Sequence, residues 1–201
     1  MDQTKIDALR ARPVPAFSHL IDGKHVPAFD GGTMDILSPI DGQVFTQVAR
    51  GTAADMEAAI ASGRTAFEDR RWAGQPPAVR KKVLMKWADL IEANALELAV
   101  LGVRDNGTEI GMAIKAEPGS AAGTIRYYAE ALDKIYGEIA PTSSDILGMI
   151  HKEPVGVVGA ITPWNFPMMI GAWKLGPSLA MGNSVVLKPS ETASLSLMRM
   201  C

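Results

Sequence analysis

The chain has 201 residues, of which 47% are hydrophobic and 21% are charged, and its formal net charge is −2. These values are ordinary for a globular protein and give no electrostatic reason to expect nucleic acid or a membrane as partner. A single cysteine, Cys201, excludes an internal disulfide, and the start of the chain lacks the basic and apolar blocks of a secretory signal. We therefore expect a cytoplasmic protein, and we expect no metal site.

The first 50 residues predict a lead-in segment followed by two hairpins. Residues 1–15 are polar and contain two prolines, which favours an irregular or helical segment. Asp22-Gly23 and Asp41-Gly42 then interrupt two β-forming runs, 18–26 and 34–48, and Asp-Gly is a strong signal for a hairpin turn. Because isolated hairpins are marginally stable, both must pack on another surface.

The middle of the chain predicts three helices. Thr52 suits the N-cap of the first, with Asp55 in a weak capping box, and Met56, Ile60 and Phe67 share one face of it. A second helix follows the two prolines at 76–77 and ends at 105–107. Its expected core stripe is Val79, Val83, Trp87, Leu90, Ile91, Leu98 and Leu101. The third helix, over about 119–134, carries Ala121, Ile125, Tyr128, Leu132 and Ile135 on one face.

The last third of the chain predicts a β segment and then a parallel unit. Residues 138–153 are β-like around a turn cluster at 142–145. Two apolar runs, Val155–Ile161 and Val185–Leu187, then flank the helix-forming segment Met168–Met181. This order predicts a strand–helix–strand unit, the smallest piece of a parallel nucleotide-binding sheet. Pro177 is expected to kink or break the helix.

Polar residues follow both predicted strands, where open α/β sheets bind their ligands. Asn165 lies between Pro163 and Pro167 in a loop that should be stiff, and its amide suits the stabilisation of an oxyanion. Lys188 and Glu191 suit the hydroxyls of a ribose. The residue chemistry leaves two alternatives open, because Asn165 can satisfy a turn and Lys188 and Glu191 can form a surface ion pair. No Gly-x-Gly-x-x-Gly fingerprint supports the nucleotide interpretation.

At these residues the chain resembles the aldehyde dehydrogenase superfamily. The resemblance is carried by Pro163-Trp-Asn-Phe-Pro167, Trp173-Lys-Leu-Gly-Pro177 and the run Ala180–Glu191, and it extends back to Leu20. Within the superfamily, residues 131–138 and 149–154 resemble the γ-glutamyl-γ-aminobutyraldehyde dehydrogenases of putrescine breakdown. The motifs therefore cover almost the whole chain.

The resemblance implies an α/β fold that forms the N-terminal portion of a Rossmann-like cofactor domain. Residues 1–137 would supply its hairpins and helices, residues 138–154 a β-hairpin oligomerisation segment, and residues 155–201 the first strand–helix–strand unit of the NAD-binding sheet. It also implies that the full-length parent is a homo-oligomer, either a dimer or a tetramer.

The resemblance also assigns roles to individual residues. Asn165 matches the side chain that helps to bind the oxyanion, while Lys188 and Glu191 match contacts to the adenosine ribose. The floor of the cofactor cleft is matched by Trp164 and by the backbone of Ile161 and Thr162, and Pro163 is also expected to bind the cofactor. The implied cofactor is NAD, with NADP as the alternative, and Glu191 favours NAD because a carboxylate disfavours a 2′-phosphate.

The reaction implied by the family is oxidation of an aldehyde to a carboxylic acid with NAD(P), here of an aminoaldehyde such as γ-glutamyl-γ-aminobutyraldehyde. Family members use a cysteine nucleophile and a glutamate base. Cys201 lacks the sequence around that nucleophile, so we expect the chain to lack the catalytic domain and to be inactive alone. The alternative is a non-catalytic nucleotide-binding or subunit-interaction fragment, which NAD titration and mixing with intact enzyme would distinguish.

Overall fold

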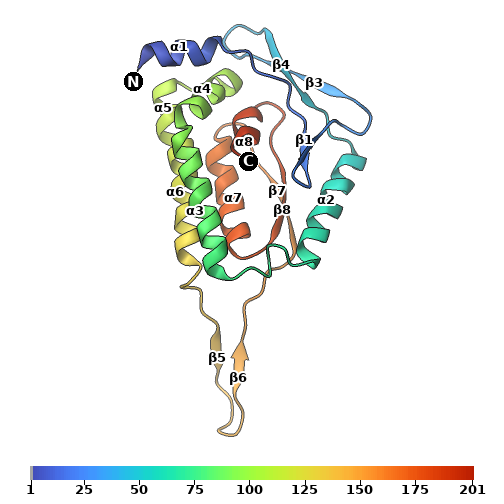
Figure 1. The fold of residues 1–201 in the computed structure, drawn as a ribbon, viewed down its shortest axis with the longest axis vertical. Coiled ribbons are helices and arrows are strands. Elements are labelled where there is room, and N and C mark those ends of the chain that lie inside the picture. The colour runs from blue at the N-terminus through green and yellow to red at the C-terminus, as the bar shows by residue number, and fades with distance from the viewer. Residues whose placement is uncertain (1) are drawn as a thin grey trace.

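The structure is a computed structural model that describes residues 2–201 (Figure 1). The chain begins with helix α1 (Gln3–Ala11) and continues into two antiparallel hairpins, β1 (His19–Ile21) with β2 (Lys24–Val26) and β3 (Thr33–Leu37) with β4 (Val44–Ala49). Asp22 and Gly23 have φ values of 52° and 69°, the left-handed conformation that a tight hairpin turn requires. Both predicted hairpins are confirmed.

Helix α2 (Ala53–Glu68) begins at the predicted capping box. The Thr52 N–H donates to Asp55 Oδ2 over 2.8 Å, and the Asp55 N–H donates back to Thr52 Oγ1. The packing inferred for its apolar face is wrong, because Met56 and Ile60 are exposed. The helix instead places Gly63 against the strands, at Val157 and Ser184. A small residue is needed where the helix and the strands come this close, and hydrophobic periodicity does not indicate such a position.

The predicted second helix is two helices in the structure, α3 (Pro77–Ala93) and α4 (Ala95–Asn106). Asn94 separates them with a φ of −107° and a ψ of 16°, and its side-chain amide donates to the Leu90 carbonyl over 2.8 Å. An asparagine that bonds its own backbone in this way competes with the helix, so the chain changes direction there. The predicted end is confirmed, since Gly107 ends α4 with a φ of 78°.

The predicted stripe on these helices is also partly wrong. Its outer members Val79, Val83 and Leu90 are exposed, whereas α3 buries Leu84, Ala88 and Ile91. Helix α6 (Pro118–Ala131), which carries Ala121, Ala122 and Ala129 in the core, packs on this face, and small side chains let the two helices approach. The sequence pattern predicted burial of the face with the largest apolar residues. In the structure, the face that packs on α6 contains the small residue Ala88.

Helix α6 confirms the third predicted helix, although its last predicted apolar residue, Ile135, is exposed. A short helix that the pattern did not indicate, α5 (Ile110–Ala116), precedes it. Glu117 lies at the junction between α5 and α6, immediately before Pro118.

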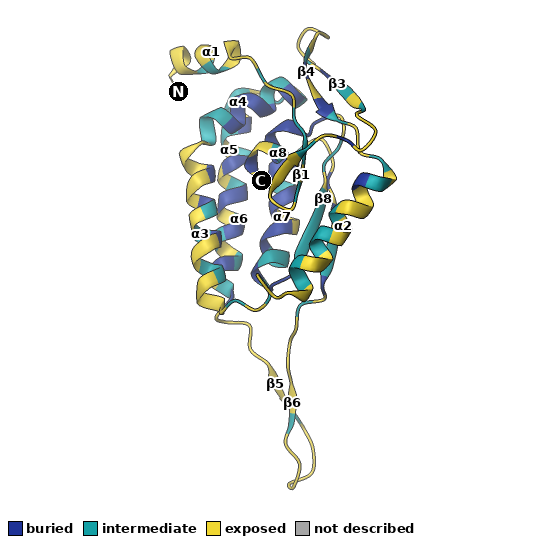
Figure 2. Cartoon of the chain, turned by 45° about the vertical axis from the view of Figure 1, so that its right-hand side comes forward, coloured by how far each residue is buried: buried dark blue, intermediate teal, exposed yellow. Residues whose placement is uncertain are grey.

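Strands β5 (Glu138–Ala140) and β6 (Gly148–Ile150) form an antiparallel hairpin that extends away from the body of the molecule (Figure 1). Most of its residues are exposed along both strands and the turn (Figure 2). The predicted β segment is confirmed, while the proposed division of the chain at residues 137 and 154 stays a prediction.

The predicted strand–helix–strand unit is confirmed as β7 (Val157–Ile161), α7 (Pro167–Ala180) and β8 (Ser184–Lys188), followed by α8 (Leu195–Met200). The two strands are parallel, with Ile161 opposite Lys188. Pro177 does not break the helix, because α7 continues through it to Ala180, and the alternative of a kink there stays a prediction.

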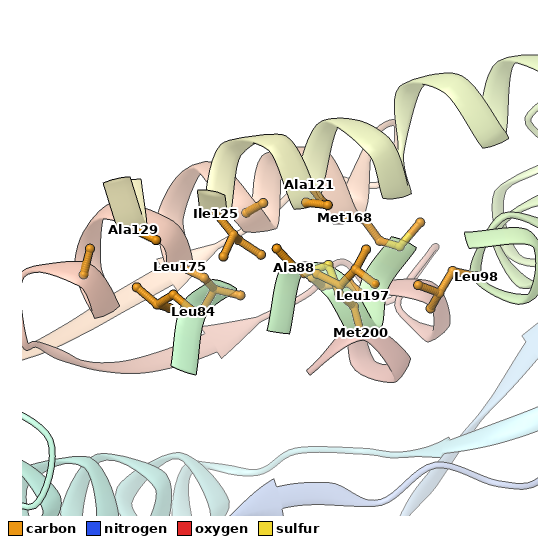
Figure 3. Close-up of a cluster of buried hydrophobic side chains, with 14 of the residues drawn as sticks. Leu84, Ala88, Leu98, Ala121, Ile125, Ala129, Met168, Leu175, Leu197 and Met200 are labelled. Carbon is orange, nitrogen blue, oxygen red and sulfur yellow. The ribbon is translucent and has the colours of Figure 1, made fainter. Parts of the chain in front are cut away.

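The main core lies between α3, α6, α7 and α8 (Figure 3). Its members include Leu84, Ile125, Met168, Leu175 and Leu197. Val185 and Leu187 of β8 pack against this core from the sheet, and α2 contacts the other face of the sheet. The α/β class is therefore confirmed. Within residues 2–201, no helix combines the length and the apolar character needed to cross a membrane.

Candidate functional site

The two loops predicted to hold a ligand begin side by side at the carboxyl ends of β7 and β8. The Thr162 N–H donates to the Lys188 carbonyl over 3.2 Å, one step beyond the last paired residues of the strands. The chain then leaves β7 into residues 163–166 and leaves β8 into residues 189–194. The structure thus brings the predicted residues Asn165, Lys188 and Glu191 to one edge of the sheet.

One face of β7 is open at this edge. Residues 157, 159 and 161 share that face because side chains alternate along a strand. Val157 is covered by α2, since a Cβ placed on Gly63 would lie 3.2 Å from Val157 Cγ1. Beyond it, Gly159 has no atom within 4 Å of an added Cβ, and Ile161 is 77% exposed. The carboxyl end of this face is a bare floor that a flat ligand can cover.

Lys188 and Glu191 form the ion pair that the sequence left as one alternative. Lys188 Nζ lies 2.8 Å from Glu191 Oε2, and both side chains are exposed. The hydrogen bond from Lys188 lowers the pKa of Glu191, so the carboxylate is ionised at neutral pH. An exposed pair of this kind contributes little to stability. Its groups therefore remain accessible to a polar ligand at the end of β8.

The loop after β7 presents Asn165 to solvent. Thr162 is buried at the start of this loop, whereas Pro163, Trp164 and Asn165 are exposed. Turn-forming side chains elsewhere bond their own backbone, as when Asn106 Oδ1 accepts the Thr108 N–H over 2.9 Å. The Asn165 side chain forms no such bond with any of residues 2–201. The simple turn alternative is therefore not seen, and the amide is available to a ligand.

Sequence reasoning missed a buried carboxylate directly behind this loop. Glu117 Oε2 accepts the N–H of Met168 over 2.9 Å and that of Met169 over 3.0 Å, in the first turn of α7. Glu117 is 4% exposed, and burial raises the pKa of its carboxyl group. It lies 51 residues from Met168 in the chain, so no local capping pattern could reveal it.

A second buried carboxylate holds the helix that follows the other loop. Asp105 Oδ2 accepts the Leu195 N–H over 2.7 Å at the start of α8. Asp105 is 2% exposed, and burial raises its pKa to about 7. The sequence marked Asp105 only as part of a helix end. Each helix that leaves the site thus has its first turn bonded to a buried carboxylate from an earlier part of the chain.

The far end of α7 is held as well. Trp72 Nε1 donates to the Leu179 carbonyl over 2.8 Å, and Arg80 Nε donates to the Ala180 carbonyl over 3.1 Å. Carbonyls in the last turn of a helix lack partners within the helix, so these donors satisfy them. With Glu117 at its start, α7 is bonded at both ends to other parts of the fold.

Cys201 lies at the end of α8, and it is the one thiol of the chain. The residue is exposed, yet desolvation around its sulfur raises the pKa of the thiol to about 12. Such a thiol is protonated at neutral pH and is a weak nucleophile. The described residues, 2–201, contain no group of three His, Cys, Asp or Glu side chains suited to hold a metal.

Comparison with known proteins identifies the family. The family model for the aldehyde dehydrogenase family matches residues 26–201. NADP/NAD-dependent aldehyde dehydrogenase PuuC of Escherichia coli strain K12 is 47% identical over 180 residues, which is 90% of this chain and 36% of that protein.

Solved structures agree with this match. The γ-glutamyl-γ-aminobutyraldehyde dehydrogenase of Burkholderia cenocepacia J2315 superposes with a TM-score of 0.96 at 42% identity, covering 100% of this chain and 41% of that one. An indole-3-acetaldehyde dehydrogenase of P. syringae, solved with NAD⁺, gives 0.96 at 40% identity, covering 100% and 40%. The chain spans 36% of the length of the curated relative. It belongs to the aldehyde dehydrogenase family.

Proposed function

We propose that residues 2–201 supply the adenosine side of the cofactor site and the oxyanion donor of an NAD(P)-dependent aldehyde dehydrogenase. The observation that carries this proposal is the bond from the Thr162 N–H to the Lys188 carbonyl over 3.2 Å. That bond joins the loop of Asn165 to the strand end that bears Lys188 and Glu191. A cofactor contact and a catalytic donor therefore belong to one site.

The described residues fit the adenosine half of a dinucleotide. The exposed floor at Gly159 and Ile161 offers a flat surface, which the exposed residues Pro163 and Trp164 would extend. The Thr162 side chain is buried, so we assign only the backbone of this residue to the floor. Lys188 can donate to a ribose hydroxyl and Glu191 can accept from one. When bound, the nicotinamide cofactor supplies the hydride acceptor.

The cofactor preference follows from the charge of Glu191. The carboxylate is negative at neutral pH and repels a 2′-phosphate. Lys188, at 2.8 Å, offsets part of that repulsion. We propose NAD as the preferred cofactor, with NADP accepted more weakly.

Asn165 is proposed to act on the aldehyde oxygen. Its amide N–H₂ would donate to that oxygen as negative charge develops during attack on the carbonyl carbon. One donor of this kind contributes about 10²–10³ in rate. We assign neither the nucleophilic thiolate nor the general base to any of residues 2–201, because Cys201, the one thiol, lacks the sequence that surrounds the nucleophile of the family. The chain alone is proposed to be inactive in aldehyde oxidation.

The proposed substrate of the whole protein is an aminoaldehyde such as γ-glutamyl-γ-aminobutyraldehyde. Support comes from the likeness to PuuC and to the Burkholderia enzyme that carries that substrate in its name. The chain covers only part of both relatives, so the assignment concerns the whole protein that contains these residues.

A second candidate role, subunit interaction, is favoured by the β5–β6 hairpin. Ile139 and Met149 face each other across this hairpin and are 73% and 76% exposed. Apolar side chains grouped on a projecting element mark a surface that another protein covers. We propose that this surface joins copies of the chain in a homo-oligomer, which is compatible with the enzyme role.

Titration of the chain with NAD in a calorimeter tests the cofactor proposal. The proposal predicts binding that Lys188→Ala and Glu191→Ala both weaken. Lys134→Ala is the matched control, because Lys134 also forms an exposed ion pair, with Asp133, but lies just after the end of α6 and outside the proposed site. If Lys134→Ala binds NAD as the unaltered chain does while Lys188→Ala and Glu191→Ala bind it more weakly, the proposed site is supported. Equal NAD affinity in all three variants would refute it.

A further inference from the structure

The start of α7 has a capping arrangement that its own sequence does not provide. Its N-cap residue, Phe166, offers no side-chain acceptor, and Pro167 has no N–H. Two donors of the first turn, at Met168 and Met169, are therefore left without a partner inside the helix. Met168 is fully buried, so its N–H cannot donate a hydrogen bond to solvent water.

Glu117 supplies the missing acceptor from another part of the fold. One carboxylate oxygen, Oε2, accepts both N–H groups, at 2.9 and 3.0 Å. Its own backbone is fixed on both sides: the Glu117 N–H donates to the Ala113 carbonyl over 3.1 Å, and the Glu117 carbonyl accepts the Ala121 N–H over 2.9 Å. The side chain therefore projects from a rigid junction between α5 and α6.

A carboxylate in this position has no ion pair to justify its burial. Oε1 has no hydrogen-bond partner within residues 2–201, and none of the ion pairs in that range involves Glu117. Burial of an unpaired carboxyl group opposes folding, which is consistent with the raised pKa. The two N–H bonds that Glu117 accepts offset part of this cost, and they also fix the first turn of α7.

Fixing this first turn has a consequence for Asn165. Asn165 lies one residue before the N-cap, Phe166, and three residues before Met168. Its loop is fixed at the other end by the bond from the Thr162 N–H to the Lys188 carbonyl. Only residues 163–166 connect that bond to the first turn held by Glu117. A shift of the first turn would therefore move Asn165 directly.

We propose that Glu117 is a positioning residue for Asn165: its carboxylate fixes the first turn of α7 and thereby the loop that presents the amide. This inference rests on the proposed function, since it assigns Asn165 the role of oxyanion donor. Glu117 touches neither substrate nor cofactor in this account. Its effect on the rate passes through Asn165 alone.

The test is a double-mutant cycle in the whole protein that contains this chain, with kcat and the KM for NAD as readouts. Asn165→Ala should lower kcat by about 10²–10³. Glu117→Ala should lower kcat by about tenfold, as expected for a donor displaced from its working position, with the KM for NAD within about twofold. In the Asn165→Ala background, Glu117→Ala should lower kcat less than about twofold further, because the group that it positions is gone.

Two further variants separate positioning from loss of fold. Glu117→Gln keeps an oxygen that can accept both N–H groups and should recover most of the lost kcat. Asp105→Asn alters the corresponding cap of α8, and its effect on kcat should be the same in both Asn165 backgrounds. Hydrogen exchange of the Met168 and Met169 amides, measured on the chain itself, should accelerate in Glu117→Ala and stay slow in Glu117→Gln.

The outcomes separate this inference from the function on which it rests. An unchanged kcat in Asn165→Ala would overturn the proposed function, and this inference with it. If Asn165→Ala is defective but Glu117→Ala lowers kcat by the same factor in both backgrounds, the inference alone is overturned. Unchanged exchange at Met168 and Met169 in Glu117→Ala would also overturn it.

Discussion

Ile161 and Lys188 are register partners at the carboxyl ends of two parallel strands, and the next amide along, Thr162 N–H, bonds the Lys188 carbonyl over 3.2 Å. This relationship joins the two halves of the candidate site. A ligand that lies on Ile161 is next to the strand end from which Lys188 and Glu191 project.

The first prediction concerns cofactor preference. Glu191→Gln removes the negative charge while keeping the size of the side chain, so repulsion of a 2′-phosphate is lost. We expect NADP to bind about tenfold more tightly than to the unaltered chain, an effect of about 1.4 kcal/mol. Calorimetric titration with each cofactor measures it. An unchanged ratio of NAD to NADP affinity would show that Glu191 does not face the ribose.

The second prediction concerns the pH dependence of stability. The pKa of Asp105 is about 7 in the folded chain and 3.8 as its ordinary value, because burial disfavours the charge. Between these values the folded state keeps a proton that the unfolded state has released. The stability contributed by this group is therefore fully present below pH 3.8 and is lost as the pH rises through about 7.

Urea unfolding at pH 5 and at pH 8 measures this effect. The chain should lose stability between the two values, and Asp105→Asn should lose less, because its amide cannot ionise. The pKa of Glu117 is also raised, so Asp105→Asn should still lose some stability as the pH rises. If the free energy of unfolding changes equally with pH in the unaltered chain and in Asp105→Asn, Asp105 is not a buried group that titrates in this range.

The third prediction concerns the packing of α8 on α7. A Cβ added at Gly171 would lie 2.5 Å from Leu197 Cδ1, and Leu197 is fully buried. Gly171→Ala should therefore lower the free energy of unfolding by about 1–3 kcal/mol. The matched control is Gly123→Ala in α6, where an added Cβ meets no atom within 4 Å. That change should raise stability by about 0.5–1 kcal/mol, and an equal loss in both variants would contradict this packing.

The fourth prediction concerns assembly through the β5–β6 hairpin. Ile139→Glu and Met149→Glu place a charge on the exposed apolar pair of the hairpin, and a buried unpaired charge opposes association. We expect either variant to shift an oligomer toward monomer in sedimentation velocity. Val44→Glu is the control, since Val44 is also exposed but lies on β4. An unchanged distribution in both hairpin variants would refute this interface.

Much of the fold was predictable because its signals are local. The Asp22-Gly23 turn, the Thr52 capping box and the alternation of strand and helix after residue 155 each depend on neighbours in the chain. Asn165, Lys188 and Glu191 could be placed at one edge for the same reason, since parallel strands end together. Their roles required the family resemblance, because residue chemistry alone left a turn and an ion pair as alternatives.

The remaining features depend on contacts distant in sequence. Glu117 and Asp105 accept N–H groups that lie 51 and 90 residues later, at Met168 and Leu195, so no pattern of neighbouring residues could find these bonds. The packed face of α3 was misjudged because Ala88, a small residue, faces α6. Close approach of helices selects small side chains, whereas hydrophobic periodicity emphasises large ones.

The loops after β7 and β8 are proposed to bind one cofactor together. Hydrogen exchange of the chain, measured with and without saturating NAD, is the decisive experiment. NAD is expected to slow exchange in residues 159–165 and in residues 186–191, while exchange in the β5–β6 hairpin stays unchanged. Protection of only one of these segments, or of neither, would contradict this proposal.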